Sequence, residues 1–169
     1  VCDATCPHVM RVQSIIKKYA AQGYSTVIVG DKGHAEVVGL LGYAEGKGYV
    51  VQELEEIEHL PPMDKVCVVA QTTQDRRMFK VAIERLKKRY SNCESFETIC
   101  SSTYKRQDEV ISLSKSVDAM IVVGGRGSAN TTRLVTICES QGTPTFHVET
   151  DAELDLDKLK DYDTVGVTA

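Results

Sequence analysis

Two cysteines, Cys6 and Cys100, stand in the same local setting, each at the start of a segment with helical periodicity. They are 94 residues apart in the sequence (100 minus 6). A cysteine at a helix N-terminus lies at the positive end of the helix dipole, so its thiolate is favoured. Thiolate is the form that ligates metals and attacks carbon. One such cysteine could equally be a small residue in a tight turn, but the repetition favours a chemical role.

The repetition extends beyond the cysteines. After each one come a helical segment and a β-branched run that ends in glycine, at Gly30 and at Gly124, again 94 residues apart (124 minus 30). Near the end of each half, "VVAQTT" and "VGVTA" also correspond when two residues of gap are allowed. We interpret the chain as an internal duplication of two α/β units, 1–92 and 93–169.

The loops after these glycines, "GDKGHAE" and "GGRGSAN", carry groups that could bind an anion. The shift aligns His34 with Ser128 and Glu36 with Asn130. Small and polar residues between a strand and a helix can leave backbone N–H groups for a phosphate. The second loop lacks the third glycine of a dinucleotide fingerprint, and the Gly-Lys-Ser/Thr of a Walker loop is absent. His34 could donate a hydrogen bond to an anion and Glu36 could act as an acid, although capping of a structural loop would explain the same residues.

The remaining cysteines have plainer interpretations. Cys67 and Cys138 stand among apolar residues, which predicts buried core thiols. Cys93 falls in a polar segment that we expect to be a loop. Cys2 and Cys6 could supply two zinc ligands, but no second pair follows at ligand spacing.

Composition excludes several function classes. The chain has 169 residues, 42% of them hydrophobic, which is enough to bury a core. Its net charge of −4 argues against nucleic acid or an anionic membrane as a partner attracted by bulk charge. The basic run "RLKKRY" is typical of a helix C-terminus. Apolar runs reach only about five residues, too short to span a membrane. The first residue is Val and the chain stops at "VGVTA", so we expect a processed or truncated chain.

Alternation of strand-like and helix-like segments predicts an α/β fold with largely parallel sheets. Pro7 suits a first helical turn and Gly23 a helix end. Thr72 or Thr73 could cap the next long helix, with Asp75 in its first turn. The expected strands are "TVIVG", "YVVQ", "VCVVA", "AMIVVG", "TFHVE" and "TVGVT". The expected helices include "PHVMRVQSIIKKYAAQG", "QDRRMFKVAIERLKKRY" and "TTRLVTICESQG".

Six motifs occur in an order that resembles the LytB/IspH family of 4-hydroxy-3-methylbut-2-enyl diphosphate reductases. They are "DATCPHV", "GHAEVVGLLG", "AQTTQ", "ETICSSTYKRQ", "SANTTRL" and "VGVTA". The resemblance covers essentially the whole chain. It implies two of three similar α/β units that form a trefoil around a central [4Fe–4S] cluster, with one cysteine from each unit.

The resemblance also implies roles for individual residues. Cys6 and Cys100 match two of the three cluster cysteines. Glu36 matches the glutamate that delivers protons to the substrate, and Thr72 matches the threonine that hydrogen-bonds the substrate hydroxyl. His34 matches a histidine that holds the diphosphate.

In the second unit, Ser128 and Asn130 match diphosphate contacts within a Ser-Ser-Asn stretch. Ala129 replaces the second serine, so one hydroxyl contact must be lost or replaced by backbone. Thr73 and Thr103 are expected beside the substrate.

The chain departs from the family pattern at both ends. The N-terminal unit of the family's three is missing here, and with it one cluster cysteine and two diphosphate histidines. The Gly-Ala-Ser segment with a further diphosphate serine is also missing. We therefore expect the chain to be inactive by itself. The complete enzyme would yield isopentenyl and dimethylallyl diphosphates in the cytoplasm of a bacterium or in a plastid, with electrons from a ferredoxin or flavodoxin.

Two alternatives remain open from the residues themselves. The first is a metal-free module that binds a phosphorylated ligand and has structural cysteines. The second is an interaction domain stabilised by zinc on Cys2, Cys6 and histidines. Iron content tests the first, and tight stoichiometric zinc would support the second.

Overall fold

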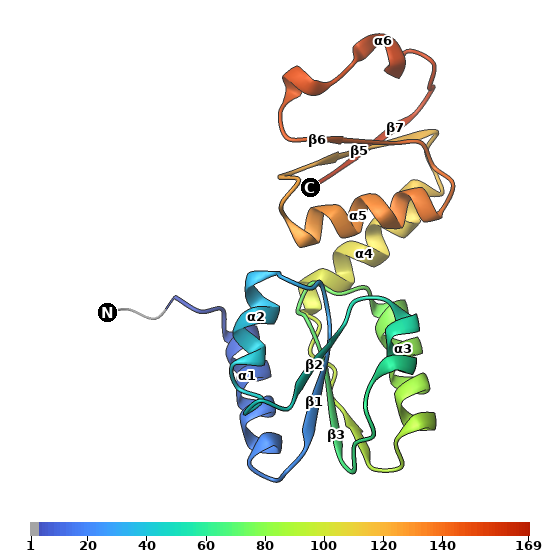
Figure 1. Ribbon diagram of the computed structural model, residues 1–169. Coiled ribbons are helices and arrows are strands. Elements are labelled where there is room, and N and C mark those ends of the chain that lie inside the picture. Colours follow the sequence, from blue (N-terminus) through green and yellow to red (C-terminus); the bar gives the residue numbers. More distant parts are fainter. Residues whose placement is uncertain (1–3) are drawn as a thin grey trace. The chain divides into compact units, whose positions relative to one another are not determined.

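The computed structural model describes residues 4–169 and divides the chain into two compact units, the first ending at Cys100 and the second beginning at Ser101 (Figure 1). The division therefore falls later than the boundary expected after residue 92. The reason is β4 (Cys93–Ser95), a short strand that pairs with β3 (Val66–Ala70) of the first sheet. Three residues are too few to show a strand periodicity in the sequence.

The first unit is built on a four-stranded parallel sheet in the order β2-β1-β3-β4. The central strand β1 (Ser25–Val29) pairs with β2 (Gly48–Val51) on one side and with β3 on the other. Every residue of β3 is buried, as expected for an inner parallel strand covered on both faces. Between β2 and β3 the chain forms the 3₁₀ helix η1 (Leu54–His59).

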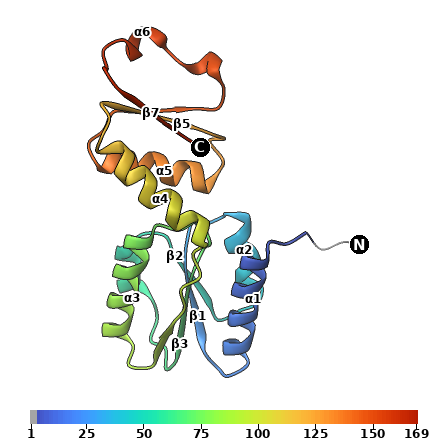
Figure 2. The ribbon, with the colours of Figure 1, turned by 180° about the vertical axis from the view of Figure 1, so that it is seen from behind.

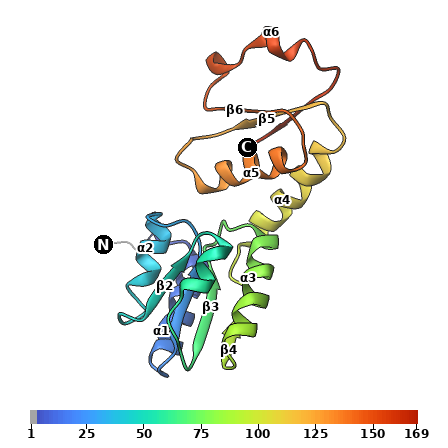
Figure 3. The same ribbon diagram turned by 45° about the vertical axis from the view of Figure 1, so that its right-hand side comes forward.

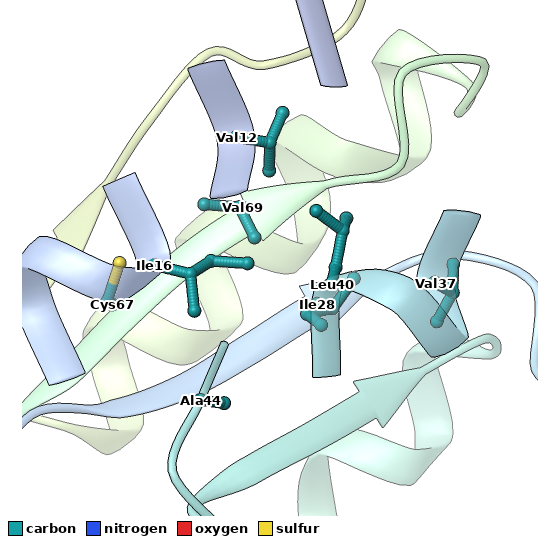
Figure 4. Close-up of a cluster of buried hydrophobic side chains, with 8 residues drawn as sticks. All are labelled: Val12, Ile16, Ile28, Val37, Leu40, Ala44, Cys67 and Val69. Carbon is teal, nitrogen blue, oxygen red and sulfur yellow. The ribbon is translucent and has the colours of Figure 1, made fainter. Parts of the chain in front are cut away.

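Helices cover both faces of this sheet (Figures 1 and 2). One face packs against α1 (Pro7–Ala20) and α2 (Ala35–Leu41), and the other is covered by α3 (Arg76–Arg89). Apolar side chains of α1, α2, β1 and β3 form the core between the first two helices and the sheet (Figure 4). Cys67 is fully buried in it, which confirms the prediction of a core thiol.

Local signals set most helix ends. Pro7 occupies the first turn of α1, and after the helix Gly23 adopts a φ of +81°, which favours glycine. The predicted cap of α3 was wrong, because Asp75 is the N-cap and its Oδ1 accepts a 2.7 Å hydrogen bond from the Met78 N–H. Thr72, in the loop before Asp75, instead bonds to Glu36 in the first unit. The basic run predicted to end a helix forms the last turn of α3.

The second unit repeats this plan with a three-stranded parallel sheet in the order β6-β5-β7. The central strand β5 lies between β6 and β7, the two strands that follow it in the sequence, as β1 lies between β2 and β3. The strands are β5 (Ala119–Val123), β6 (Thr145–Val148) and β7 (Val165–Thr168). The helices are α4 (Ser101–Ser114), α5 (Ala129–Ser140), the 3₁₀ helix η2 (Asp151–Glu153) and α6 (Leu156–Leu159) (Figure 3).

The core of the second unit joins α4 and α5 to the sheet. Val110, Met120, Leu134 and Cys138 are buried in it, so Cys138 is the second core thiol that the sequence predicted. The expected α/β fold with parallel sheets is thus confirmed in both units. None of the helices in residues 4–169 is both long enough and apolar enough to cross a membrane.

Candidate functional site

The first unit has a topological switch point between β1 and β3. The chain leaving β1 enters α2 on one face of the sheet, whereas the chain leaving β3 enters α3 on the other (Figure 1). Ligands of open α/β sheets bind in the crevice that such a divergence creates at the carboxyl ends of the strands. A Cβ on Gly30 would lie 2.9 Å from both Gln71 and Val37, so only glycine allows the two loops to approach this closely.

Glu36 and Thr72 meet across this switch point. The Thr72 backbone N–H donates to Glu36 Oε1 at 2.7 Å, and its hydroxyl Oγ1 donates to Oε2 at 2.8 Å. Both carboxylate oxygens are therefore bound by one residue that lies 36 positions further along the chain. Thr72 is buried and Glu36 is half-buried. The structure thus brings together the two residues predicted to act on a substrate hydroxyl.

Cys100 lies beside this pair. Its backbone N–H donates to the Thr72 carbonyl at 2.9 Å, and α4 begins at the next residue. Thr98 holds the same segment, because its Oγ1 accepts from the Ala70 N–H and donates to the Ala70 carbonyl, both at 2.8 Å. The cysteine is consequently fixed at the carboxyl edge of the first sheet.

Cys6 stands at the start of α1, as the sequence predicted. It is the N-cap residue, its carbonyl accepts from the Met10 N–H at 3.0 Å, and its side chain makes no capping hydrogen bond. Helix α1 runs along the sheet in the direction opposite to β1, so its N-terminal end lies toward the carboxyl ends of the strands (Figure 1). The residue is exposed.

His34 is the N-cap of α2. Its Nδ1 accepts a 3.2 Å hydrogen bond from the Glu36 N–H. A ring nitrogen that accepts an N–H carries no proton itself, so the neutral ring has its proton on Nε2. The cap therefore fixes the tautomer and leaves Nε2–H as the donor of the ring.

Gln71 is a site residue that the sequence reading did not single out. Its side chain is fully buried, its Oε1 accepts from the Asp31 N–H at 2.8 Å, and its Nε2 donates to Thr73 Oγ1 at 3.0 Å. One amide thus joins the loop after β1 to the loop after β3. The available signal was a glutamine placed directly after a strand of five apolar residues.

The second unit builds a related loop at the end of β5. Ser128 is the N-cap of α5, its Oγ accepts from the Thr131 N–H at 3.3 Å, and Ala129 and Asn130 form the first turn. A Cβ on Gly124, whose φ is +151°, would lie 2.5 Å from Thr131 Oγ1. His147 Nε2 lies 2.9 Å from the Gly124 carbonyl. Gly124 therefore allows the end of β5 to pack closely against the first turn of α5.

The other predicted contact residues occupy different places. Thr73 is half-buried and is bound by Gln71 within the first unit. Thr103 is buried in the first turn of α4, in the second unit.

Within residues 4–169, no three His, Cys, Asp or Glu side chains come together in a way that could hold a metal ion. Cys2, which the zinc alternative requires, lies outside the described residues. Burial raises the pKa of Cys67 to about 12 and also raises the pKa of Cys93 and Cys138, which disfavours their thiolates. Cys93 also begins β4 rather than lying in a loop, which corrects our expectation. Cysteine thiolates are the ligand type of iron–sulfur clusters, which Cys6 and Cys100 could supply, but the described residues do not complete the ligand set of one.

Comparison with known proteins gives a consistent result. A family model described as LytB protein matches residues 1–169. A protein of Thermoanaerobacter sp. (strain X514) named 4-hydroxy-3-methylbut-2-enyl diphosphate reductase is 46% identical over the whole chain, which covers 59% of that relative. A protein of the same name from Geobacter sulfurreducens is 45% identical, with 60% of it covered. The chain therefore spans about three-fifths of the length of these relatives.

Solved structures agree. The E-1-hydroxy-2-methyl-but-2-enyl-4-diphosphate reductase from Plasmodium falciparum matches with a TM-score of 0.93 at 28% identity, covering 98% of this chain and 54% of that one. A second structure, described as (E)-4-hydroxy-3-methyl-but-2-enyl diphosphate reductase, the terminal enzyme of the non-mevalonate pathway, is 39% identical with a TM-score of 0.60. That match covers 100% of this chain and 61% of the other.

Proposed function

The chain belongs to the LytB family, and from this premise we propose that it supplies two α/β units to a 4-hydroxy-3-methylbut-2-enyl diphosphate reductase. The observation that carries the proposal is the Glu36–Thr72 pair at the switch point of the first sheet, next to the backbone of Cys100. Reductive removal of an allylic hydroxyl needs a proton donor, a group that binds the hydroxyl and a source of electrons, which Glu36, Thr72 and a cluster on Cys100 would supply.

The reaction replaces a C–O bond by a C–H bond. An allylic alcohol, two electrons and two protons give the corresponding alkene and one water. When bound, a [4Fe–4S] cluster would supply electrons and a Lewis-acidic iron at the hydroxyl oxygen. Cys6 and Cys100 would be two of its ligands, and the third would come from outside the described residues.

Glu36 and Thr72 would deliver one of the two protons, the one that leaves with the hydroxyl group as water. In the structure the Thr72 hydroxyl donates to Glu36 Oε2. A protonated Glu36 reverses this bond, since it donates from Oε2 to Thr72 Oγ1 and leaves the threonine hydrogen free to move to a substrate oxygen. One proton thereby passes from the carboxyl group to the substrate while Thr72 remains a neutral hydroxyl. The Thr72 backbone N–H keeps the carboxyl group in place throughout.

The two N-cap loops would bind the diphosphate. His34 contributes a neutral Nε2–H donor, while Ser128, Asn130 and the backbone N–H groups at the start of α5 contribute donors at the positive end of a helix. Ala129 offers its backbone N–H where the resemblance led us to expect a hydroxyl. Thr73 and Thr103 stay predicted neighbours of the substrate.

Several finer statements belong to the same proposal. The products would be isopentenyl and dimethylallyl diphosphates, the electron donor a ferredoxin or flavodoxin, and the location the cytoplasm. We expect no turnover from the 169-residue chain alone, because it holds two of the three expected cluster cysteines.

The experiment is anaerobic reconstitution with iron and sulfide of a protein extended to the full length of its relatives. Mössbauer spectra and turnover of the hydroxylated allylic diphosphate would be recorded. We expect a cluster signal that both Cys6→Ser and Cys100→Ser disrupt, and product formation by the unsubstituted protein. Diphosphate binding without iron or turnover would favour the metal-free binding module instead.

A further inference from the structure

Lys32, in the loop between β1 and His34, is held by the segment that follows β2. Its backbone N–H donates to Gln52 Oε1 at 2.8 Å, and its ammonium group pairs with the Glu56 carboxylate. The other Glu56 oxygen accepts from the Gln52 N–H at 2.9 Å. These three residues form a closed ring of contacts, which we term the first loop strap.

The second unit contains two of these three contacts at aligned positions. The Arg126 N–H donates to Glu149 Oε1 at 2.6 Å, and Arg126 Nη2 pairs with Glu153 Oε2 at 2.5 Å. Arg126 follows Lys32 by 94 residues (126 minus 32), the interval that separates the two N-caps. The two acceptors follow their first-unit counterparts by 97 residues (149 minus 52 and 153 minus 56). These contacts form the second loop strap.

A cation two residues before a phosphate-binding N-cap would ordinarily be assigned to the phosphate. Here both cations are bound to carboxylates instead. Glu56 is held ionised, because hydrogen bonds from Lys32 and from the Gln52 N–H lower its pKa. The backbone N–H bond of each cation fixes the main chain two residues before His34 and before Ser128.

We propose that Lys32 and Arg126 are positioning residues, which hold the two N-cap loops in their anion-binding conformation and do not bind the diphosphate themselves. This inference rests on the proposed function for the identity of the anion. Neutral donors then contact the ligand, while the cations act on it through the backbone.

The two possible roles of Lys32 predict opposite changes in KM when its partner Glu56 is substituted. If Lys32 is a positioning residue, Lys32→Met and Glu56→Gln both loosen the loop. Each then raises the KM of the full-length protein for the allylic diphosphate by about two- to fivefold, the range for an exposed ion pair, with kcat nearly unchanged. If Lys32 binds the diphosphate, Glu56→Gln frees the ammonium group and lowers the KM. That outcome overturns the proposal.

Exchanging the two charges gives a rescue test. The double variant Lys32→Glu with Glu56→Lys rebuilds the ion pair in reverse but loses the acceptor of the Gln52 N–H, so we expect its KM to return part of the way toward that of the unsubstituted protein. A phosphate-binding lysine would not tolerate the exchange, and a KM that worsens in the double variant overturns the proposal. Arg126→Met, Glu153→Gln and their charge exchange repeat the test in the second unit.

Amide hydrogen exchange of residues 31–36 and 125–130 supplies a readout that needs no substrate. We expect Lys32→Met to accelerate exchange in the first segment and Arg126→Met in the second. Lys158→Met is the matched control, since it also removes an exposed ion pair, with Asp155 at 3.2 Å, but one that includes no residue of either N-cap loop. If the unsubstituted full-length protein shows no turnover, the proposed function fails, while unchanged exchange in both strap variants overturns the straps separately.

Discussion

The two units of this chain share one backbone plan but place side chains of different chemical types on it. In each, a glycine ends the central strand, a strapped loop follows, and an N-cap residue opens the next helix. In the first unit the N-cap is His34, and two residues later Glu36 is bound by Thr72. In the second unit the aligned residues are Ser128 and Asn130, which do not titrate near neutral pH.

Under the proposed function, this difference separates proton transfer from anion binding. A carboxyl group can pass a proton to a bound ligand only if it is held near the reacting atom, and Thr72 holds Glu36 in one position. Serine, asparagine and backbone N–H groups bind an anion without changing their own charge. The comparison therefore shows that the same loop backbone can carry titrating or non-titrating side chains, and under the proposed function those side chains decide what each loop does.

The largest expected effect is on turnover, and it tests whether only the loop of the first unit, through Glu36, can supply the acid. Glu36→Gln keeps the shape of the side chain but removes the exchangeable proton, so turnover in the full-length protein should fall by about 10²-fold or more. The cluster, followed by its Mössbauer signal, should remain. Asn130→Asp, added to this variant, places a carboxyl group in the second loop. Recovery of turnover by that double variant would show that the loops are interchangeable and would break the comparison.

The next effect concerns the buried amide that joins the two loops of the first unit. Gln71→Met removes both hydrogen bonds at nearly constant size, so the Asp31 N–H loses its partner and unfolding should become easier by about 1–3 kcal/mol. We also expect kcat to fall about tenfold, because the loop that carries Thr72 would lose its anchor. A tenfold fall corresponds to a rise of about 1.4 kcal/mol in the activation free energy. Gln74→Met is the matched control, because Gln74 is equally buried but its Oε1 accepts from the Asp75 N–H at the start of α3. Equal effects of both variants on kcat would reduce Gln71 to a structural role.

A third prediction compares the two core thiols. Burial raises the pKa of Cys67 to about 12, whereas an unfolded thiol titrates near 9.0. The resulting stability is therefore fully present below pH 9 and is lost as the pH rises toward 12. At pH 10 the loss should be about 1.4 kcal/mol relative to pH 8. Burial also raises the pKa of Cys138, although its hydrogen bonds, one of them with Thr145, oppose the rise.

Urea unfolding between pH 8 and pH 11 measures this difference. Cys67→Ala should flatten the alkaline decline in the free energy of unfolding more than Cys138→Ala does. Parallel curves for the two variants would argue against a distinct role for burial at Cys67.

The smallest expected effect separates capping from ligand binding at His34. Asparagine at this position can still accept the Glu36 N–H, whereas alanine cannot, so His34→Ala should be less stable than His34→Asn by about 1 kcal/mol. Both variants lose the Nε2–H donor, so both should weaken diphosphate binding in the full-length protein. Thermal unfolding and KM measurements check the two halves of this prediction. Similar stability of the two variants would mean that the His34 cap contributes nothing.

Much of the fold could be predicted because the signals are local. Continuous β-branched runs indicated inner parallel strands such as β3, and Pro7 and Gly23 indicated the limits of α1. The errors occurred where those signals are short or shared. β4 has only three residues, and several side chains before α3 could cap it, of which Asp75 is the one in position to accept the Met78 N–H.

The candidate site residues also fall into those with a local sequence signal and those without one. Cys6, His34, Glu36 and Ser128 could be singled out because an internal repeat places each beside a helix start. Gln71 and the loop straps could not, because their function lies in contacts with residues distant in sequence and their own types are ordinary.

By itself the sequence determined the α/β elements, their duplication at an interval of 94 residues and the family to which the chain belongs. These properties depend on periodicity, residue type and spacing, all of which are features of the linear sequence. Only the tertiary structure decided that Glu36 is bound by Thr72, since this contact requires β1 to lie next to β3 although β2 separates them in sequence. Strand order depends on which faces α2 and α3 cover, and no local pattern near either residue states it.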